Sequence, residues 1–146
     1  MNENLLSAAP PFKLYKMRAI YIGGFIGGPL VAGYLAAKNF KQLGQPENAK
    51  RAWMIAIITT IVVFGSLSLV PDPEMIPVAI IPLIYLGIGD MLVQKYQGDD
   101  IKSHIKDGGK MYSTWRAVWI GIIGLAAIVG IGYLIALLKN TPFWSD

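Results

Sequence analysis

The stretch RAIYIGGFIGGPLVAGYLAAKNF, residues 18–40, constrains this chain most, because it is apolar and uncharged from Ala19 to Ala37. At about 1.5 Å of rise per helical residue, that run is long enough to cross a hydrocarbon core about 30 Å thick. Pro29 lacks an amide N–H and crowds the carbonyl of Phe25, so we expect the helix to bend near its middle. The sequence therefore predicts a membrane-embedded helix with a kink at Pro29.

Composition favours a membrane protein throughout the chain. Hydrophobic residues make up 54% of the sequence and charged residues only 15%, whereas soluble proteins contain about 25% charged residues. We predict an all-α integral membrane protein of one domain, residues 1–146, with four transmembrane helices and a short amphipathic helix on the membrane surface. The expected transmembrane helices cover about residues 17–38, 46–70, 75–95 and 113–139, and the surface helix covers about residues 99–107.

Prolines mark the expected helix boundaries. Pro46 followed by Glu47 is typical of a helix start, because the first helical amide has no intrahelical partner in any case. The segment 71–74, Pro-Asp-Pro-Glu, predicts a tight turn between the second and third helices. Pro82 lies well inside the predicted third helix, where we expect it to produce a kink.

Small residues recur on two of the predicted helices. Because lipid supplies no hydrophobic drive between helices, association there depends on close backbone approach, which glycine permits. The expected helix-packing glycines are Gly23, Gly24, Gly27, Gly28, Gly33, Gly121 and Gly124.

Basic residues predict the orientation. With four spans, nine Lys and Arg residues lie on the side of the two long loops and four on the opposite side, which places the loops in the cytoplasm and both termini outside. If the GGPL segment instead turns back as a re-entrant hairpin, the division becomes twelve against one. We favour the kinked span, because each hairpin arm would have only about nine residues and its mid-membrane turn would need cover from protein.

Two positions are candidates for ion chemistry. Asp90 is an acid inside an apolar run, which makes it a candidate ion or proton ligand, although a contact with interfacial water or a basic residue explains it more simply. His104, with three aspartates nearby in the sequence, is a weak metal signal. We therefore predict no metal site and no cofactor.

The segment LYKMRAIYIGGFIGGPLVAGYLAAKNFKQLG, together with HIKDGGKMYSTW, resembles a group of small bacterial multi-pass membrane proteins that carry a GGPL, AGYL and NF-x-x-LG run. No activity is assigned to that group. The resemblance implies a protein of the bacterial inner membrane and no functional residues.

No phosphate-binding loop, pair of catalytic carboxylates or nucleophile triad is visible in the sequence, and the basic residues flank apolar runs rather than forming a nucleic-acid surface. The leading hypothesis is a non-enzymatic membrane subunit or scaffold that contacts the lipid bilayer and a second copy or another membrane protein. The alternative is a small oligomeric transporter or channel that uses Asp90.

Overall fold

The computed structural model describes residues 9–71, 76–77 and 79–139. Within these residues the chain forms four helices and two short strands: β1 Lys13–Leu14, α1 Met17–Gln42, α2 Pro46–Ser68, α3 Ile80–Lys106, β2 Lys110–Met111 and α4 Thr114–Lys139. The protein is all-helical apart from the two-residue strands, which pair in parallel. By length and composition, three segments could cross a membrane: α1, Pro46–Leu67 of α2 and Thr114–Leu138 of α4.

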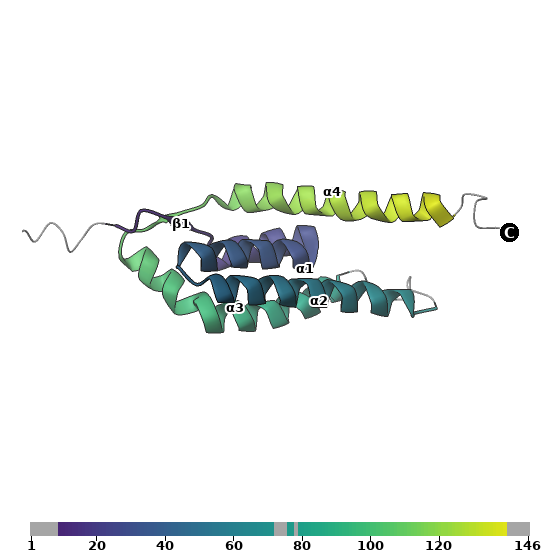
Figure 1. Ribbon diagram of the computed structural model, residues 1–146, viewed down its shortest axis with the longest axis horizontal. Helices are drawn as coiled ribbons and strands as arrows, with labels where there is room; N and C mark the ends of the chain where they lie inside the picture. The colour runs from purple at the N-terminus through teal and green to yellow at the C-terminus, as the bar shows by residue number, and fades with distance from the viewer. Residues whose placement is uncertain (1–8, 72–75, 78, 140–146) are drawn as a thin grey trace, which may run out of the picture.

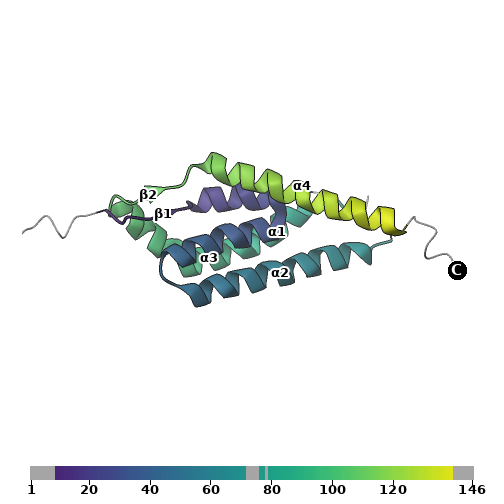
Figure 2. The same cartoon turned by 45° about the horizontal axis from the view of Figure 1, so that its top comes forward.

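Helix α1 is not continuous. Gly28 has φ 80° and ψ −175°, and Pro29 follows it as the first residue of a second helical arm. The two arms run in opposite directions, so the chain returns to the end of the molecule from which it came (Figure 2). The favoured expectation of a kinked continuous span is therefore wrong, and the hairpin is the observed arrangement.

The hairpin of α1 is the centre of the fold. α2, α3 and α4 each pack against α1 and make little direct contact with one another (Figure 1). The largest cluster of buried apolar residues joins both arms of α1 to the start of α4, and its members are Tyr15, Ala19, Ile20, Val31, Leu35 and Ala117. Burial follows this arrangement: 56% of the most apolar window of α1 is buried, against 6% for those of α2 and α4.

Helix α2 begins at Pro46, as predicted from the Pro-Glu pair. Two of its hydroxyl side chains bond to the backbone of their own helix: Thr60 Oγ1 donates to the Ala56 carbonyl at 2.7 Å, and Ser66 Oγ donates to the Val62 carbonyl at 2.7 Å. A hydroxyl satisfied in this way places no unpaired polar group on an apolar helix.

Helix α3 differs from expectation at both ends. The predicted start near residue 75 lies outside the described residues, and the described helix begins at Ile80, so Pro82 occupies the first turn rather than a kinked interior. At the other end, the separate surface helix at 99–107 is wrong, because α3 continues without a break to Lys106. Its last turns bury Gln97, Ile101 and His104, which share one helical face at spacings of four and three.

The N-terminal segment lies at the same end of the molecule as the connection between α3 and α4. Lys13 pairs with Lys110 and Leu14 with Met111, and the Tyr112 amide donates to the Leu14 carbonyl at 2.8 Å. The expectation that both termini lie on the side opposite the long loops is therefore wrong for the N-terminal segment. The reason is the reversal at Gly28. The second arm of α1 runs back beside the first, so α1 begins and ends at the same end of the molecule (Figure 2).

Candidate functional site

The break in α1 is covered by its neighbours. Pro29 is buried, and the Tyr85 hydroxyl of α3 donates to the Gly24 carbonyl, in the last turn before the break, at 3.0 Å. A reversal inside a membrane requires that such backbone groups be satisfied by protein. The tyrosine of α3 meets that requirement for Gly24.

The predicted packing glycines lie where helices approach most closely. A Cβ at Gly27 would stand 2.7 Å from the Gly121 carbonyl oxygen of α4, and one at Gly24 would stand 2.8 Å from the Ala32 Cβ in the other arm. Gly23 lies at both kinds of contact, and Gly124 lies at the contact between α1 and α4. Gly33 lies against Ala56 of α2. These glycines therefore pack within one chain. Gly28 differs, because its positive φ, rather than a close contact, requires glycine.

The two ends of α1 are joined by a polar clasp formed by Tyr15, Asn39 and Gln97. Asn39 Oδ1 accepts from the Tyr15 amide at 2.7 Å, and Asn39 Nδ2 donates to the Tyr15 carbonyl at 2.9 Å. Gln97 of α3 completes it, since its Oε1 accepts from Asn39 Nδ2 at 3.3 Å and its Nε2 donates to the Ala36 carbonyl at 2.8 Å. All three residues are fully buried, so the clasp fixes α3 to both arms of the hairpin.

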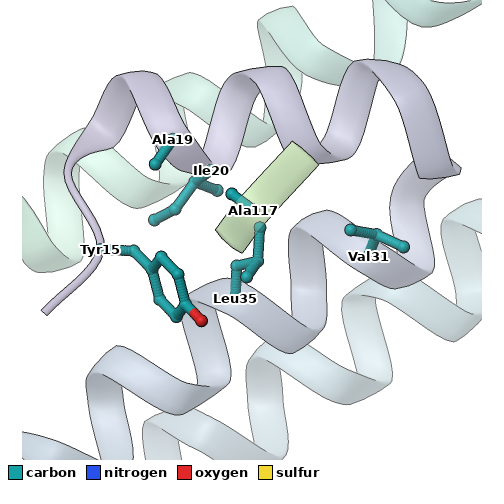
Figure 3. Packing of buried hydrophobic residues seen from close by; sticks show 6 residues of the cluster. All are labelled: Tyr15, Ala19, Ile20, Val31, Leu35 and Ala117. Carbon is teal, nitrogen blue, oxygen red and sulfur yellow. The ribbon is translucent and has the colours of Figure 1, made fainter. Parts of the chain in front are cut away.

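Aromatic and basic side chains stack beside the clasp. The Tyr15 and Tyr112 rings lie 4.5 Å apart, and Arg116 and Lys38 lie over the Tyr112 ring at 4.7 and 5.3 Å. Burial raises the pKa of the Tyr15 hydroxyl, and the positive charge of Arg116 opposes that shift. Figure 3 shows the Tyr15 ring pointing toward Leu35 and Ala117 from the start of the first arm.

His104 has a structural environment. Its Nε2 donates to the Lys110 carbonyl at 3.0 Å, and the Phe12 ring stacks on the imidazole at 4.9 Å. Gly109 lies directly against the same ring, where a Cβ would overlap it. Among the described residues, no three His, Cys, Asp or Glu side chains gather in a way that could hold a metal ion. His104 therefore orders the turn before β2.

Asp90 lies at the junction of two cavities. A groove of about 190 Å³ has α1 as its floor and α2 and α3 as its walls, and its lining is almost entirely apolar. A second cavity of about 450 Å³, at the basic end of the molecule, is lined in part by Lys16, Arg18 and Lys102. The two cavities share Met17, Tyr21 and Asp90. The apolar groove and the basic cavity therefore lie side by side, and the Asp90 carboxylate lines both.

The carboxylate of Asp90 is only half satisfied in the described part of the chain. Its Oδ2 accepts from Gln94 Nε2 at 2.8 Å, one turn along α3. Its Oδ1 is buried without a hydrogen-bond partner there. Of the two simpler explanations for Asp90, interfacial water or a basic residue, the second is not seen, because no ion pair of Asp90 is formed among the described residues. One oxygen of a buried carboxylate is therefore left without a partner there.

Sequence reasoning missed the clasp and Tyr85. Asn39 and Gln97 lie among charged and polar residues beyond the ends of apolar runs, and no sequence spacing relates Asn39 to Tyr15. Comparison of this chain with protein-family models, with curated proteins and with solved structures finds no match.

Proposed function

We propose that this chain is a non-enzymatic subunit or scaffold of the bacterial inner membrane that associates with a second copy of itself or with another membrane protein. In this arrangement α2, α3 and α4 cross the bilayer, and α1 enters and leaves on one side. The N-terminal segment and the connections α1–α2 and α3–α4 face the cytoplasm, and the C-terminus lies outside.

The charge distribution supports this orientation. With α1 as a hairpin, twelve Lys and Arg residues fall toward the end of the molecule that holds β1, β2 and the connections α1–α2 and α3–α4, and Lys139 lies toward the other end. Positive charge is enriched on the cytoplasmic side of membrane proteins. This distribution is more uneven than the nine to four that a continuous span would give.

The observation that supports the proposed association is that the α1 hairpin, at the centre of the fold, extends along only part of α2 and α4. The hairpin turns back at Gly28, whereas α2 and α4 continue beyond it (Figures 1 and 2). Past that point, a Cβ at Gly130 or Gly132 of α4 would meet no described atom within 4 Å. Helices left without a central element provide an open surface for another helix, and small residues allow its close approach.

Cysteine crosslinking in native membranes tests this proposal, since the chain contains no cysteine. We expect Gly130→Cys, beyond the hairpin, to form a disulfide-linked dimer or to react with a membrane partner when a bifunctional thiol–amine reagent is added. Ile122→Cys is the control, because that exposed side chain lies beside the hairpin on the same helix. Monomeric mass in detergent, with no adduct at either position, would contradict the proposal.

A second candidate function, a small oligomeric transporter or channel, is favoured by the unpartnered Oδ1 of Asp90 between the two cavities. An ionisable group at membrane depth is a functional candidate by default. The substitution Asp90→Asn separates the two functions, because it retains hydrogen bonding and removes the charge. We expect purified protein in liposomes to show no flux driven by a pH gradient, and Asp90→Asn to assemble normally; a flux that this substitution abolishes would favour the transporter.

A further inference from the structure

We propose that the groove between α2 and α3, together with the basic cavity it joins, binds one anionic phospholipid of the surrounding bilayer. One acyl chain occupies the apolar groove. The phosphate lies in the basic cavity near Lys16, Arg18 and Lys102. This binding site is independent of whether the protein acts as a subunit or as a transporter.

The apolar part of the site has a shape and a position suited to an acyl chain. Its floor is α1, which contributes the small side chains of Ala32 and Ala36, and its walls include Ile55 of α2 and Leu86 of α3. Because α2 and α3 make little direct contact, the groove opens sideways, toward the lipid in the proposed arrangement. Its volume of about 190 Å³ exceeds that of an engineered apolar cavity of about 150 Å³ that binds benzene. A segment of acyl chain therefore fits.

The polar part determines the charge of the occupant. Lys16, Arg18 and Lys102 line the second cavity and Arg51 lines the groove, so the two linings together contain four cationic side chains and one carboxylate, Asp90. Lys102 is held only by an exposed contact to Asp99 at 3.8 Å, which is weak. The excess positive charge favours an anionic headgroup over a zwitterionic one.

The order of these features along the molecule matches the order within a lipid. The apolar lining lies toward the membrane-embedded parts of α2 and α3, and the basic lining lies at the ends of the helices. A free phosphate would use the second cavity and leave the groove unfilled. The position of the two cavities side by side, with Met17, Tyr21 and Asp90 in the lining of both, therefore favours a membrane lipid.

Native mass spectrometry of the purified protein in detergent tests this site, with dioleoylphosphatidylglycerol and dioleoylphosphatidylcholine as probes at equal concentrations. We expect the protein to retain one phosphatidylglycerol in preference to phosphatidylcholine. An excess of glycerol 3-phosphate should not displace it, because that anion has no acyl chain to occupy the groove. Equal retention of the two lipids, or displacement by glycerol 3-phosphate, would overturn the proposal.

Two glycines on α3 provide a matched pair of variants for the groove. Gly89 lines the groove and Gly87 does not, and a Cβ at either position meets no described atom within 4 Å. Gly89→Leu should therefore fill the groove and abolish phosphatidylglycerol retention, with thermal stability unchanged. Gly87→Leu should retain the lipid as the original protein does. Undiminished retention by Gly89→Leu would contradict the assigned position of the acyl chain.

Charge removal tests the headgroup position independently of the groove. Arg18→Gln and Lys102→Gln should each weaken phosphatidylglycerol binding about fivefold and leave phosphatidylcholine binding unaffected. Lys106→Gln, an exposed position on α3 outside both cavities, is the control. An effect of Lys106→Gln as large as those of the other two would show that overall charge, rather than this cavity, selects the lipid.

Discussion

Asn39 holds the backbone of Tyr15 at both its amide and its carbonyl, with hydrogen bonds of 2.7 and 2.9 Å across 24 residues of chain. Along a continuous helix, residues that far apart would be separated by about 36 Å. The two hydrogen bonds can therefore form only because α1 reverses direction. It also positions the N-terminal segment against the last turns of α3, through Gln97.

Removal of the clasp should destabilise the hairpin. Asn39→Ala leaves the buried amide and carbonyl of Tyr15 and the Gln97 Oε1 without their partner, and we expect a loss of about 3 kcal/mol in unfolding free energy. Chemical denaturation in detergent, followed by circular dichroism, measures it. Asn48→Ala is the control, since its part-buried side chain bonds only to the nearby Gln45; a similar loss there would show that the clasp has no special importance.

The turn of the hairpin depends on glycine at position 28. A φ of 80° with ψ near −175° is a backbone conformation that side chains disfavour, so Gly28→Ala should cost about 1–3 kcal/mol. Crowding around that Cβ is not the cause, because its nearest neighbour among the described residues, Ile128 Cδ1, is 3.6 Å away. Thermal unfolding of Gly28→Ala beside Gly87→Ala, which is in open helix, measures the difference; equal melting temperatures would contradict the observed turn.

The contact between α1 and α4 depends on the absence of a side chain at position 27. The Cβ of Gly27→Ala would stand 2.7 Å from the Gly121 carbonyl oxygen and 2.9 Å from its Cα, and neither backbone atom can rotate away. We expect a loss of about 1–3 kcal/mol from the enforced separation of the helices. Gly130→Ala, with open space around it, should not be destabilising. A reversed order of stability in the two variants would show that α4 packs elsewhere.

Much of the fold could be predicted from local sequence, and the reversal could not. The apolar runs indicated helices, and Pro46 marked the start of α2, because both signals depend on neighbouring residues. A kink and a reversal at GGPL differ chiefly in the torsion angles of Gly28, and only contacts distant in sequence, such as Asn39 with Tyr15, select between them. The charge distribution did favour the hairpin. The objection to it was an uncovered turn, and Tyr85 from α3 supplies part of that cover.

The candidate site likewise contains features that could be predicted from local sequence and features that could not. Asp90 was evident as an acid in an apolar run, and the packing glycines were evident from their spacing. The groove and the basic cavity were not, because the groove combines both arms of α1 with α2 and α3, and the basic cavity combines the first arm with α3. Cavities formed by four segments have no local sequence signal.

The most direct test of the re-entrant hairpin is the side of the membrane on which Ala9 lies. Single variants Ala9→Cys, Ser103→Cys and Ser145→Cys in this cysteine-free chain would be labelled on intact cells with a membrane-impermeant maleimide, then again after the membrane is opened. The hairpin predicts that Ala9→Cys and Ser103→Cys react only in opened cells and that Ser145→Cys reacts in intact ones. Labelling of Ala9→Cys in intact cells together with Ser145→Cys would mean that α1 crosses the membrane, and would contradict the hairpin.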